Sequence, residues 1–166
     1  TNGDLILQGA NTRFQSRVEL HGRRVLLDHD GDLNLEAMFL NGGANGAPSI
    51  INVNGSVISD PTSASFVESG SGRAFRADII GASVDGFFQD ASPVVFNVTG
   101  DLLLSSPDSR ISSVEVIIAQ NVQLTNSTDM NIAGINAQNL FLEASGNITQ
   151  SDAIIVAGTT TINASS

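Results

Sequence analysis

Apolar and polar residues alternate in a pattern that recurs along the last third of the chain. Four segments share the order polar, apolar, any residue, apolar, polar, and they begin at Asp101, Asn121, Asn139 and Thr159. Such alternation is typical of a strand that buries one face. The expected inward positions are Leu102 and Leu104, Val122 and Leu124, Leu140 and Leu142, and Thr160 and Ile162. The nearly even spacing of the four starts indicates an internal repeat.

Two further short apolar stretches lie between successive starts. One is expected at Ile111, Ile132 and Ile148, and the other at residues 114–118, 135 and 154–156. Each unit of about 20 residues thus holds three short strands, and one unit cannot bury its own apolar face. Stacking at the ~4.8 Å spacing of neighbouring strands can bury it. The repeat predicts an all-β fold, a parallel β-solenoid with about 20 residues per coil.

The first 99 residues show weaker copies of the same pattern. Residues 3–7 resemble residues 31–35 and 100–104, although the step from Asp4 to Asp32 is longer than any step between the later starts. Strand-like runs occur at 17–20, 25–27, 50–58, 76–80 and 94–98, and residues 35–40 suggest one helical turn. The turn-rich segments 40–49 and 60–73 are expected to protrude as loops. Because no linker divides the chain, we expect one solenoid domain over 1–166, with irregular coils at 1–99 and regular repeats at 100–166.

Composition narrows the range of partners and locations. Hydrophobic residues make up 41% of the chain and charged residues 14%, and there is no Cys, Trp, Tyr or Lys. The net charge of −10 disfavours nucleic acid, since phosphate binding needs clustered Lys and Arg. No apolar run approaches the ~20 residues of a membrane span, so no membrane insertion is expected. The polar N-terminus has no signal-peptide pattern, and we expect a processed product or an excised segment.

The C-terminal repeats resemble those of a known family. The residues that carry the likeness are 100–104, 139–150 and 157–164. They are similar to the haemagglutinin-type repeats of filamentous haemagglutinins and related two-partner-secretion adhesins. The resemblance implies a right-handed parallel β-helix in a non-catalytic, structural and adhesive segment of a large secreted or cell-surface bacterial adhesin. It also implies an extracellular or surface location and a host glycan or surface receptor as partner. The family's secretion domain, with its Asn-Pro-Asn signatures, is not found in the chain.

One acidic cluster is a candidate calcium site. Asp28, Asp30 and Asp32 alternate along the chain, and in an extended strand they would share one face. Three carboxylates offer the oxygen ligands that Ca²⁺ prefers, although the spacing is not that of an EF-hand loop. The alternative is an acidic, solvated strand edge and turn. The two histidines, His21 and His29, are expected to lie at the surface or in turns.

An enzyme and a filament subunit are the alternatives to an adhesive segment. Asp78, Asp85 and Asp90 lie near Phe87 and Phe88, and a β-helix hydrolase or lyase would need such convergent acids. The chain has no Lys, and Arg110 is its only Arg after residue 76, so we expect no enzyme and no cofactor. The first alternative to the adhesive segment is nevertheless a self-assembling extracellular filament subunit that stacks head-to-tail, because open coil ends expose unpaired backbone groups. The carbohydrate-active enzyme is the second alternative.

Asparagine offers two further kinds of site. Glycosylation sequons begin at Asn54, Asn97, Asn126, Asn147 and Asn163, although an Asn-, Ser- and Thr-rich chain contains some by chance. Asn121 and Asn139 begin successive repeats and are expected to stack as an amide ladder.

Overall fold

The computed structural model describes residues 3–9, 12–40, 49–58, 67–79, 84–85 and 88–165, with side chains at all of these except 37, 40, 58, 67–79, 84–85 and 88–93. These residues form a single sheet system of 15 strands, and they contain no helix. Every strand pairing is parallel. The chain is therefore an all-β parallel β-solenoid, as the repeat predicts, while its right-handed winding stays a prediction.

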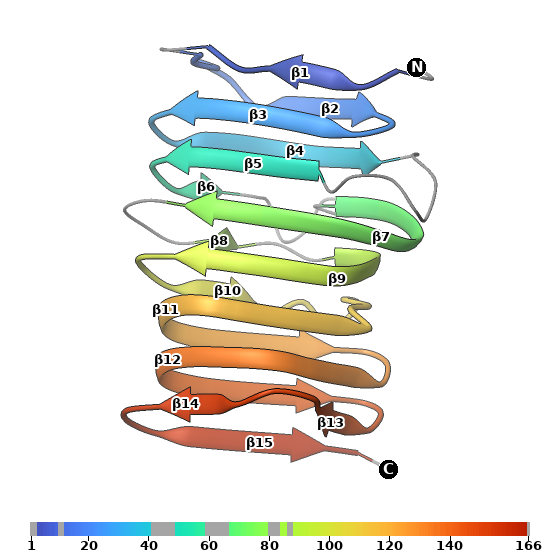
Figure 1. Cartoon of the computed structure of the whole chain (residues 1–166), viewed down its shortest axis with the longest axis vertical. Helices are drawn as coiled ribbons and strands as arrows, with labels where there is room; N and C mark the ends of the chain where they lie inside the picture. Colours follow the sequence, from blue (N-terminus) through green and yellow to red (C-terminus); the bar gives the residue numbers. More distant parts are fainter. Residues whose placement is uncertain are drawn as a thin grey trace.

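The strands succeed one another along the long axis of the molecule, with the two ends of the chain at opposite ends of that axis (Figure 1). The first eight are β1 (Leu5–Leu7), β2 (Val18–Gly22), β3 (Val25–Asp30), β4 (Leu33–Leu40), β5 (Ser49–Asn54), β6 (Val57–Ile58), β7 (Val67–Ile79) and β8 (Val84–Asp85). The others are β9 (Phe88–Val98), β10 (Leu102–Leu104), β11 (Ser113–Asn126), β12 (Met130–Ala144), β13 (Ile148–Gln150), β14 (Ile154–Val156) and β15 (Thr160–Ala164).

One column of paired residues runs through most of the solenoid. Its members are Leu33, Val57, Val84, Leu102, Val122, Leu140 and Thr160. The solenoid has about six turns, with about 20 residues per turn. The two steps from Leu33 to Val57 and from Val57 to Val84 are longer than all the later ones. These longer early steps explain why the repeat is regular only after residue 100.

A second series of pairings, on another side of the coil, joins β1, β3, β5, β7, β9, β11, β12 and β13. Leu5 pairs with Val25 in this series, whereas Leu33 belongs to the column that reaches Thr160. The alignment of residues 3–7 with 31–35 is therefore wrong, since the two segments lie on different sides of the coil. Their sequences match because both are strands with one buried face.

The last coil confirms the three short strands of each unit. Strands β13, β14 and β15 all pair with the long strand β12. The alignment of Ile132 with Ile148 is wrong, because Met130 pairs with Ile148, and Ile132 pairs with Val114 and Gln150. Units of unequal length keep register through irregularities in the pairing, one of them between Val116 and Ala119. These irregularities cannot be seen in the hydrophobic pattern.

The core consists of the inward side chains of successive coils. Leu102, Leu104, Leu124 and Leu142 are at most 1% exposed. Strand β15 keeps the predicted register, but Thr160 and Ile162 are exposed because no described coil covers them. In the last coil, a side chain can therefore hold an inward position and still be exposed to solvent.

Two expectations for the irregular half are corrected. Residues 35–40 are not helical, because they belong to strand β4, whose partners are β2, β6 and β7. Residues 67–73 are not a loop either, since β7 begins at Val67. The rest of the two expected loops, residues 41–48 and 60–66, lies outside the described residues.

Candidate functional site

The acidic cluster at residues 28–32 spans the end of β3 and the turn that follows it. Asp28 and Asp30 are outward positions of β3, and His29 between them points into the core. The strand ends at Asp30, and Gly31 has a φ of 99°, a value that suits glycine. Asp32 therefore lies beyond a turn, and the three carboxylates do not continue one strand face as expected.

Each of the three carboxylates accepts a hydrogen bond from the next coil. Asn52 Nδ2 donates to Asp28 Oδ1 at 2.6 Å, and Asn54 Nδ2 donates to Asp30 Oδ1 at 3.1 Å. The backbone N–H of Ser56 donates to Asp32 Oδ1 at 2.9 Å. Among the described residues, no three His, Asp or Glu side chains are grouped as a metal site would need. Calcium at Asp28, Asp30 and Asp32 stays a prediction, and the structure gives these side chains a role in joining two coils.

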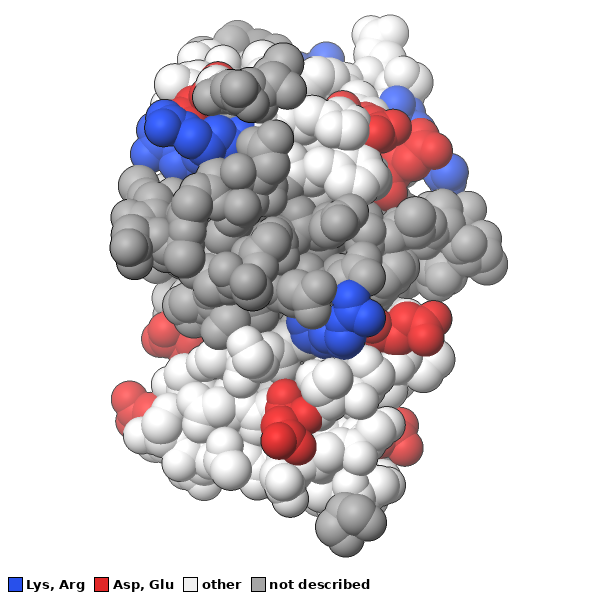
Figure 2. Space-filling view, turned by 90° about the vertical axis from the view of Figure 1, so that its right-hand side faces the viewer, with Lys and Arg blue, Asp and Glu red and all other residues white. Residues whose placement is uncertain are grey.

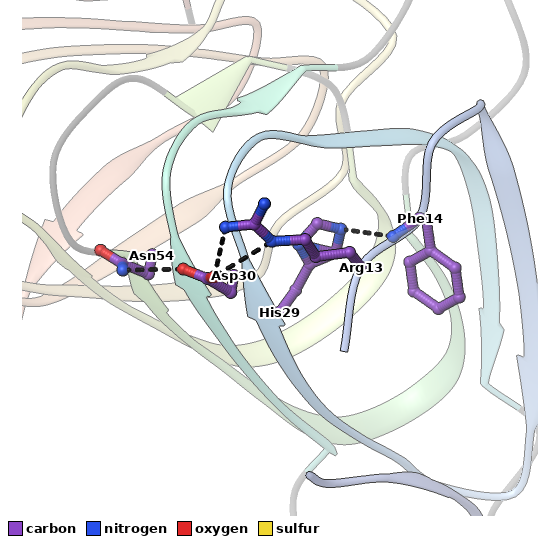
Figure 3. Close-up of polar contacts among 5 residues, drawn as sticks. All are labelled: Arg13, Phe14, His29, Asp30 and Asn54. Atoms are coloured by element: carbon purple, nitrogen blue, oxygen red, sulfur yellow. Dashed lines mark hydrogen bonds and ion pairs between the residues drawn. The ribbon is translucent and has the colours of Figure 1, made fainter. Parts of the chain in front are cut away.

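Asp30 also binds the segment that follows β1 (Figure 3). Arg13 Nε donates to Asp30 Oδ2 at 3.1 Å, and Arg13 Nη2 donates to the same oxygen at 2.5 Å. The hydrogen bond from Arg13, followed by that from Asn54, lowers the pKa of the Asp30 carboxyl. The backbone N–H of Asp30 donates to Thr12 O at 3.0 Å. The segment at Thr12–Arg13 is thus held against the end of β3 by both side-chain and backbone contacts.

His29 is buried, which corrects the expectation of a surface or turn histidine. Its side chain is 5% exposed, and its Nε2 accepts a hydrogen bond from the backbone N–H of Phe14 at 3.1 Å. The ring centroids of Phe14 and His29 are 5.4 Å apart (Figure 3). Because Nε2 is an acceptor, the neutral ring carries its proton on Nδ1, an atom with no hydrogen-bond partner.

Burial is the main cause of a lowered pKa for His29. The negative charge of Asp30 opposes this shift, and the positive charge of Arg13 adds to it. The sequence holds a signal that would have placed this residue, because Val25, Leu27 and His29 alternate as inward positions of one strand. His21 is exposed as expected, pairs with Glu19 and stacks on Phe39 with ring centroids 4.6 Å apart.

The predicted amide ladder is confirmed at the positions where successive regular repeats begin. Asn121 Nδ2 donates to Asp101 Oδ1 at 2.7 Å, and Asn139 Nδ2 donates to Asn121 Oδ1 at 2.8 Å. The ladder ends where the backbone N–H of Thr159 donates to Asn139 Oδ1 at 2.9 Å. These bonds satisfy turn groups that would otherwise depend on water, so they fix the register of adjacent coils.

Asn126 is a buried polar side chain that the pattern did not predict. It is 2% exposed, and its Oδ1 accepts from Ile111 N at 2.7 Å. Its Nδ2 donates to Ile111 O at 3.2 Å and to Thr128 O at 2.9 Å. Because its amide is enclosed, Asn126 is not an acceptor for glycosylation in the folded chain. The sequon residues Asn54, Asn147 and Asn163 are exposed, and Asn97 is half-buried.

The candidate acids of an enzyme belong to different strands. Asp78 lies in β7, Asp85 in β8 and Asp90 in β9. Their side chains, and residue Phe87 as a whole, lie outside the described part of the chain. The structure therefore leaves the absence of enzymatic activity as a prediction.

Comparison with known proteins finds a repeat family in the regular half. A family described as repeats of unknown function (DUF5649) matches residues 119–166, the last coils of the solenoid. No curated protein and no solved structure matches the chain. The described residues include no helix long and apolar enough to cross a membrane. The repeat character of the C-terminal coils thus rests on the sequence pattern, the strand register and this family match.

Proposed function

We propose that the chain is a non-catalytic structural and adhesive segment of a large secreted or cell-surface bacterial adhesin. In this role the solenoid acts as a rigid rod whose outer surface contacts a host glycan or surface receptor. The proposal adopts the resemblance of residues 100–166 to haemagglutinin-type repeats, and it places the chain outside the cell.

The observation that carries the proposal is the continuous ladder of coils from Leu33 to Thr160. Backbone pairing joins every step of this ladder, and side-chain bonds reinforce it at Asp32–Ser56 and Asp101–Asn121–Asn139. The bond between Asp28 and Asn52 joins neighbouring coils on another side. Several polar outward side chains of the described coils thus hold neighbouring coils together. This arrangement suits a protein whose task is to keep a fixed shape and present a surface.

The small share of charged residues, 14% of the chain, and the lack of Lys also fit an extracellular rod. About six turns at ~4.8 Å separate the first and last members of the ladder by about 29 Å. Small-angle X-ray scattering of the purified chain tests this shape, because the measured distance distribution must match the one that the stacked coils give.

Saturable binding to host cells tests the adhesive role. Since the chain has no Lys, an amine-reactive dye at neutral pH labels only its α-amino group and leaves the solenoid surface unmodified. We expect saturable binding that glycosidase or protease treatment of the cells removes, and the sensitive treatment identifies the receptor class. Unsaturable binding, or binding unchanged by both treatments, overturns the adhesive role even if scattering confirms the rod.

Turnover of acidic polysaccharides tests the non-catalytic part of the proposal. We expect no product from such polymers. Product formation that is lost on substituting Asp85→Asn or Asp90→Asn would replace the adhesive segment with a carbohydrate-active enzyme.

A further inference from the structure

One side of the rod carries apolar side chains that point towards solvent. Strands β1, β3, β5, β7, β9, β11, β12 and β14 follow one another on this side, here called the front sheet (Figure 1). One outward column of its register runs through Ile6, Leu26, Ile50, Arg76 and Val95. Ile6 is 56% exposed, and Leu26, Ile50 and Val95 are half-buried. A sheet face that meets water is normally polar, so an apolar column of this kind marks an interaction surface.

Three more exposed isoleucines lie on the front sheet, towards its C-terminal end. Ile117 and Ile118 form a β-bulge, because these two residues of β11 lie opposite the single residue Asn136 of β12. Asn136 pairs in turn with Ile155 of β14. Ile117, Ile118 and Ile155 are 38%, 47% and 60% exposed. Four of the five exposed large apolar side chains in the described part of the chain therefore belong to the front sheet, and a bulge directs two of them outward.

The border of the front sheet near Ile6 is basic. Arg23 Nε donates to Asp4 Oδ1 at 2.9 Å, and an Arg24 guanidinium nitrogen lies 3.1 Å from Asp4 Oδ2. Two cations thus share one carboxylate, which comes two residues before Ile6. The side chain of Arg23 is 59% exposed, so its positive charge is accessible to a partner.

The same border is acidic at the other end of the front sheet. A Cβ placed on Gly134 would lie 3.9 Å from Glu115 Cγ and 3.8 Å from Asp152 Cβ, so both acids flank a position that has no side chain. Each acid comes before the exposed isoleucines of its own coil, and the chain has no Arg, Lys or His after Arg110. Figure 2 views the rod from the side where the front strands begin, and every charged side chain in its lowest coils is acidic.

A second copy of the chain offers the surface that complements this one. When two front sheets face each other across a two-fold axis along the strand direction, the order of the coils is reversed and the strand direction is kept. The basic border of each copy then lies opposite the acidic border of the other, and both contacts form together. Ile6 shares its register column with Glu115 and Gly134, so it meets the glycine position of the other copy. A two-fold axis along the rod would instead bring like charges together.

The extent of the front sheet predicts a weak contact. Seven pairing steps separate β1 from β14, about 34 Å at ~4.8 Å per step. A strand of about five residues adds a width of about 16 Å, which gives roughly 500 Å² per copy. Stable interfaces bury about 800 Å² per partner, so we expect dissociation in the range of about 10 μM to 1 mM.

We propose that the front sheet is the contact surface between two antiparallel copies of this chain. The contact is isologous, so assembly stops at a dimer. It lies along the side of the rod and leaves both ends of the stack of coils uncovered. This inference goes beyond the adhesive role and does not depend on it, because self-association and binding to cells are measured separately.

Sedimentation velocity of the wild type and two charge-matched variants tests the proposal. Asp152→Arg places a cation opposite Arg23 and Arg24 at both contacts of the dimer. Glu143→Arg is the control, since Glu143 is also exposed and pairs with Asn163 on another side of the coil. Both variants change the net charge of each copy equally, so a difference between them comes from the location of the charge. Far-ultraviolet circular dichroism and thermal unfolding establish that both are folded.

A mixing experiment tests the antiparallel arrangement. Ile6→Asn and Ile155→Asn alter opposite ends of the front sheet, and each should weaken the dimer of its own variant. In a mixed dimer of the two variants, both changes fall on the same contact, and the other contact keeps its native residues on both copies. We therefore expect an equimolar mixture to associate more strongly than either variant alone.

We expect the wild type to form dimers, and no larger species, as its concentration rises to about 1 mM. Asp152→Arg should weaken the dimer at least about tenfold, and Glu143→Arg should weaken it less than about twofold. A wild type that stays monomeric at every concentration overturns the proposal, as does equal weakening by the two charge variants. A mixture that associates no better than its separate components overturns the antiparallel contact, and species that grow beyond a dimer overturn the two-fold symmetry.

Discussion

Replacement of Asn126 by alanine should destabilise the solenoid more than any surface asparagine replacement. The Asn126 side chain is enclosed, and its amide satisfies both the N–H and the C=O of Ile111. Asn126→Ala removes the acceptor and the donor together. Ile111 is itself buried, so water does not readily replace them.

The expected loss follows from the number and quality of these bonds. An unsatisfied buried backbone group costs about 1–3 kcal/mol. The bond to Ile111 N is short, at 2.7 Å, whereas the bond to Ile111 O is longer, at 3.2 Å. Counting the first as a full loss and the second as a partial one predicts a destabilisation of about 2–4 kcal/mol.

Urea unfolding followed by far-ultraviolet circular dichroism measures this change, since the chain has no Trp or Tyr to serve as a fluorescence probe. Stacked repeats unfold in a nearly one-dimensional manner, so hydrogen exchange at the Ile111 amide is recorded as a local measure. Asn163→Ala is the control, because Asn163 is exposed in β15 and its replacement should cost less than about 0.5 kcal/mol. Unfolding of Asn126→Ala within about 0.5 kcal/mol of the wild type, with Ile111 still protected, would show that the bonds are dispensable.

Three other perturbations test the coil contacts and the buried histidine. Folding lowers the pKa of His29, so the unfolded chain binds more protons than the folded chain. The free energy of unfolding of the wild type should therefore fall as the pH drops below about 6.5. His29→Gln should flatten this pH dependence in unfolding titrations between about pH 7 and 5. Asn121→Ala interrupts the exposed amide ladder and should cost about 1 kcal/mol in urea unfolding, a value that would be near zero if water replaced its bonds fully. Gly55→Ala should lower the free energy of unfolding by about 1–3 kcal/mol, because a Cβ at this position would clash with the backbone of Gly31. Gly3→Ala is the control, since a Cβ there meets no neighbouring atom. Equal melting temperatures for the two variants would contradict this packing.

The sequence predicts the regular coils well because their physical basis is local. Alternation at residues 102–104, 122–124 and 140–142 reports which side chains face inward, and the spacing of these segments reports one turn of the solenoid. Their partners are their nearest repeats, so little long-range information is needed. The same alternation also puts His29 and Asn126 at inward positions. It therefore predicts that both are buried, if polar residues are allowed at such positions.

The errors arise where the chain turns a corner or changes register. The apolar residues of 35–40 fit a helical spacing and so predict a helical turn, while in the structure β4 continues beside β2, β6 and β7. The pattern aligns Ile132 with Ile148, but Met130 occupies that position in the pairing. Alternation alone puts the acidic cluster on one face, but Gly31 ends that face before Asp32. Each error depends on backbone geometry that residue types do not specify.

The stacking of coils through parallel ladders determines how the protein responds to a pulling force along its axis. One coil of about 20 residues adds only about 4.8 Å to the folded length, whereas the same residues extend to about 66–72 Å when unravelled. Each coil that detaches therefore releases roughly 60–67 Å of chain. The backbone hydrogen bonds between coils lie along the axis. A pull on one end of the chain therefore breaks the bonds of the terminal coil before those of the next coil. A segment of this kind can absorb tension in discrete steps while the coils behind it keep their shape.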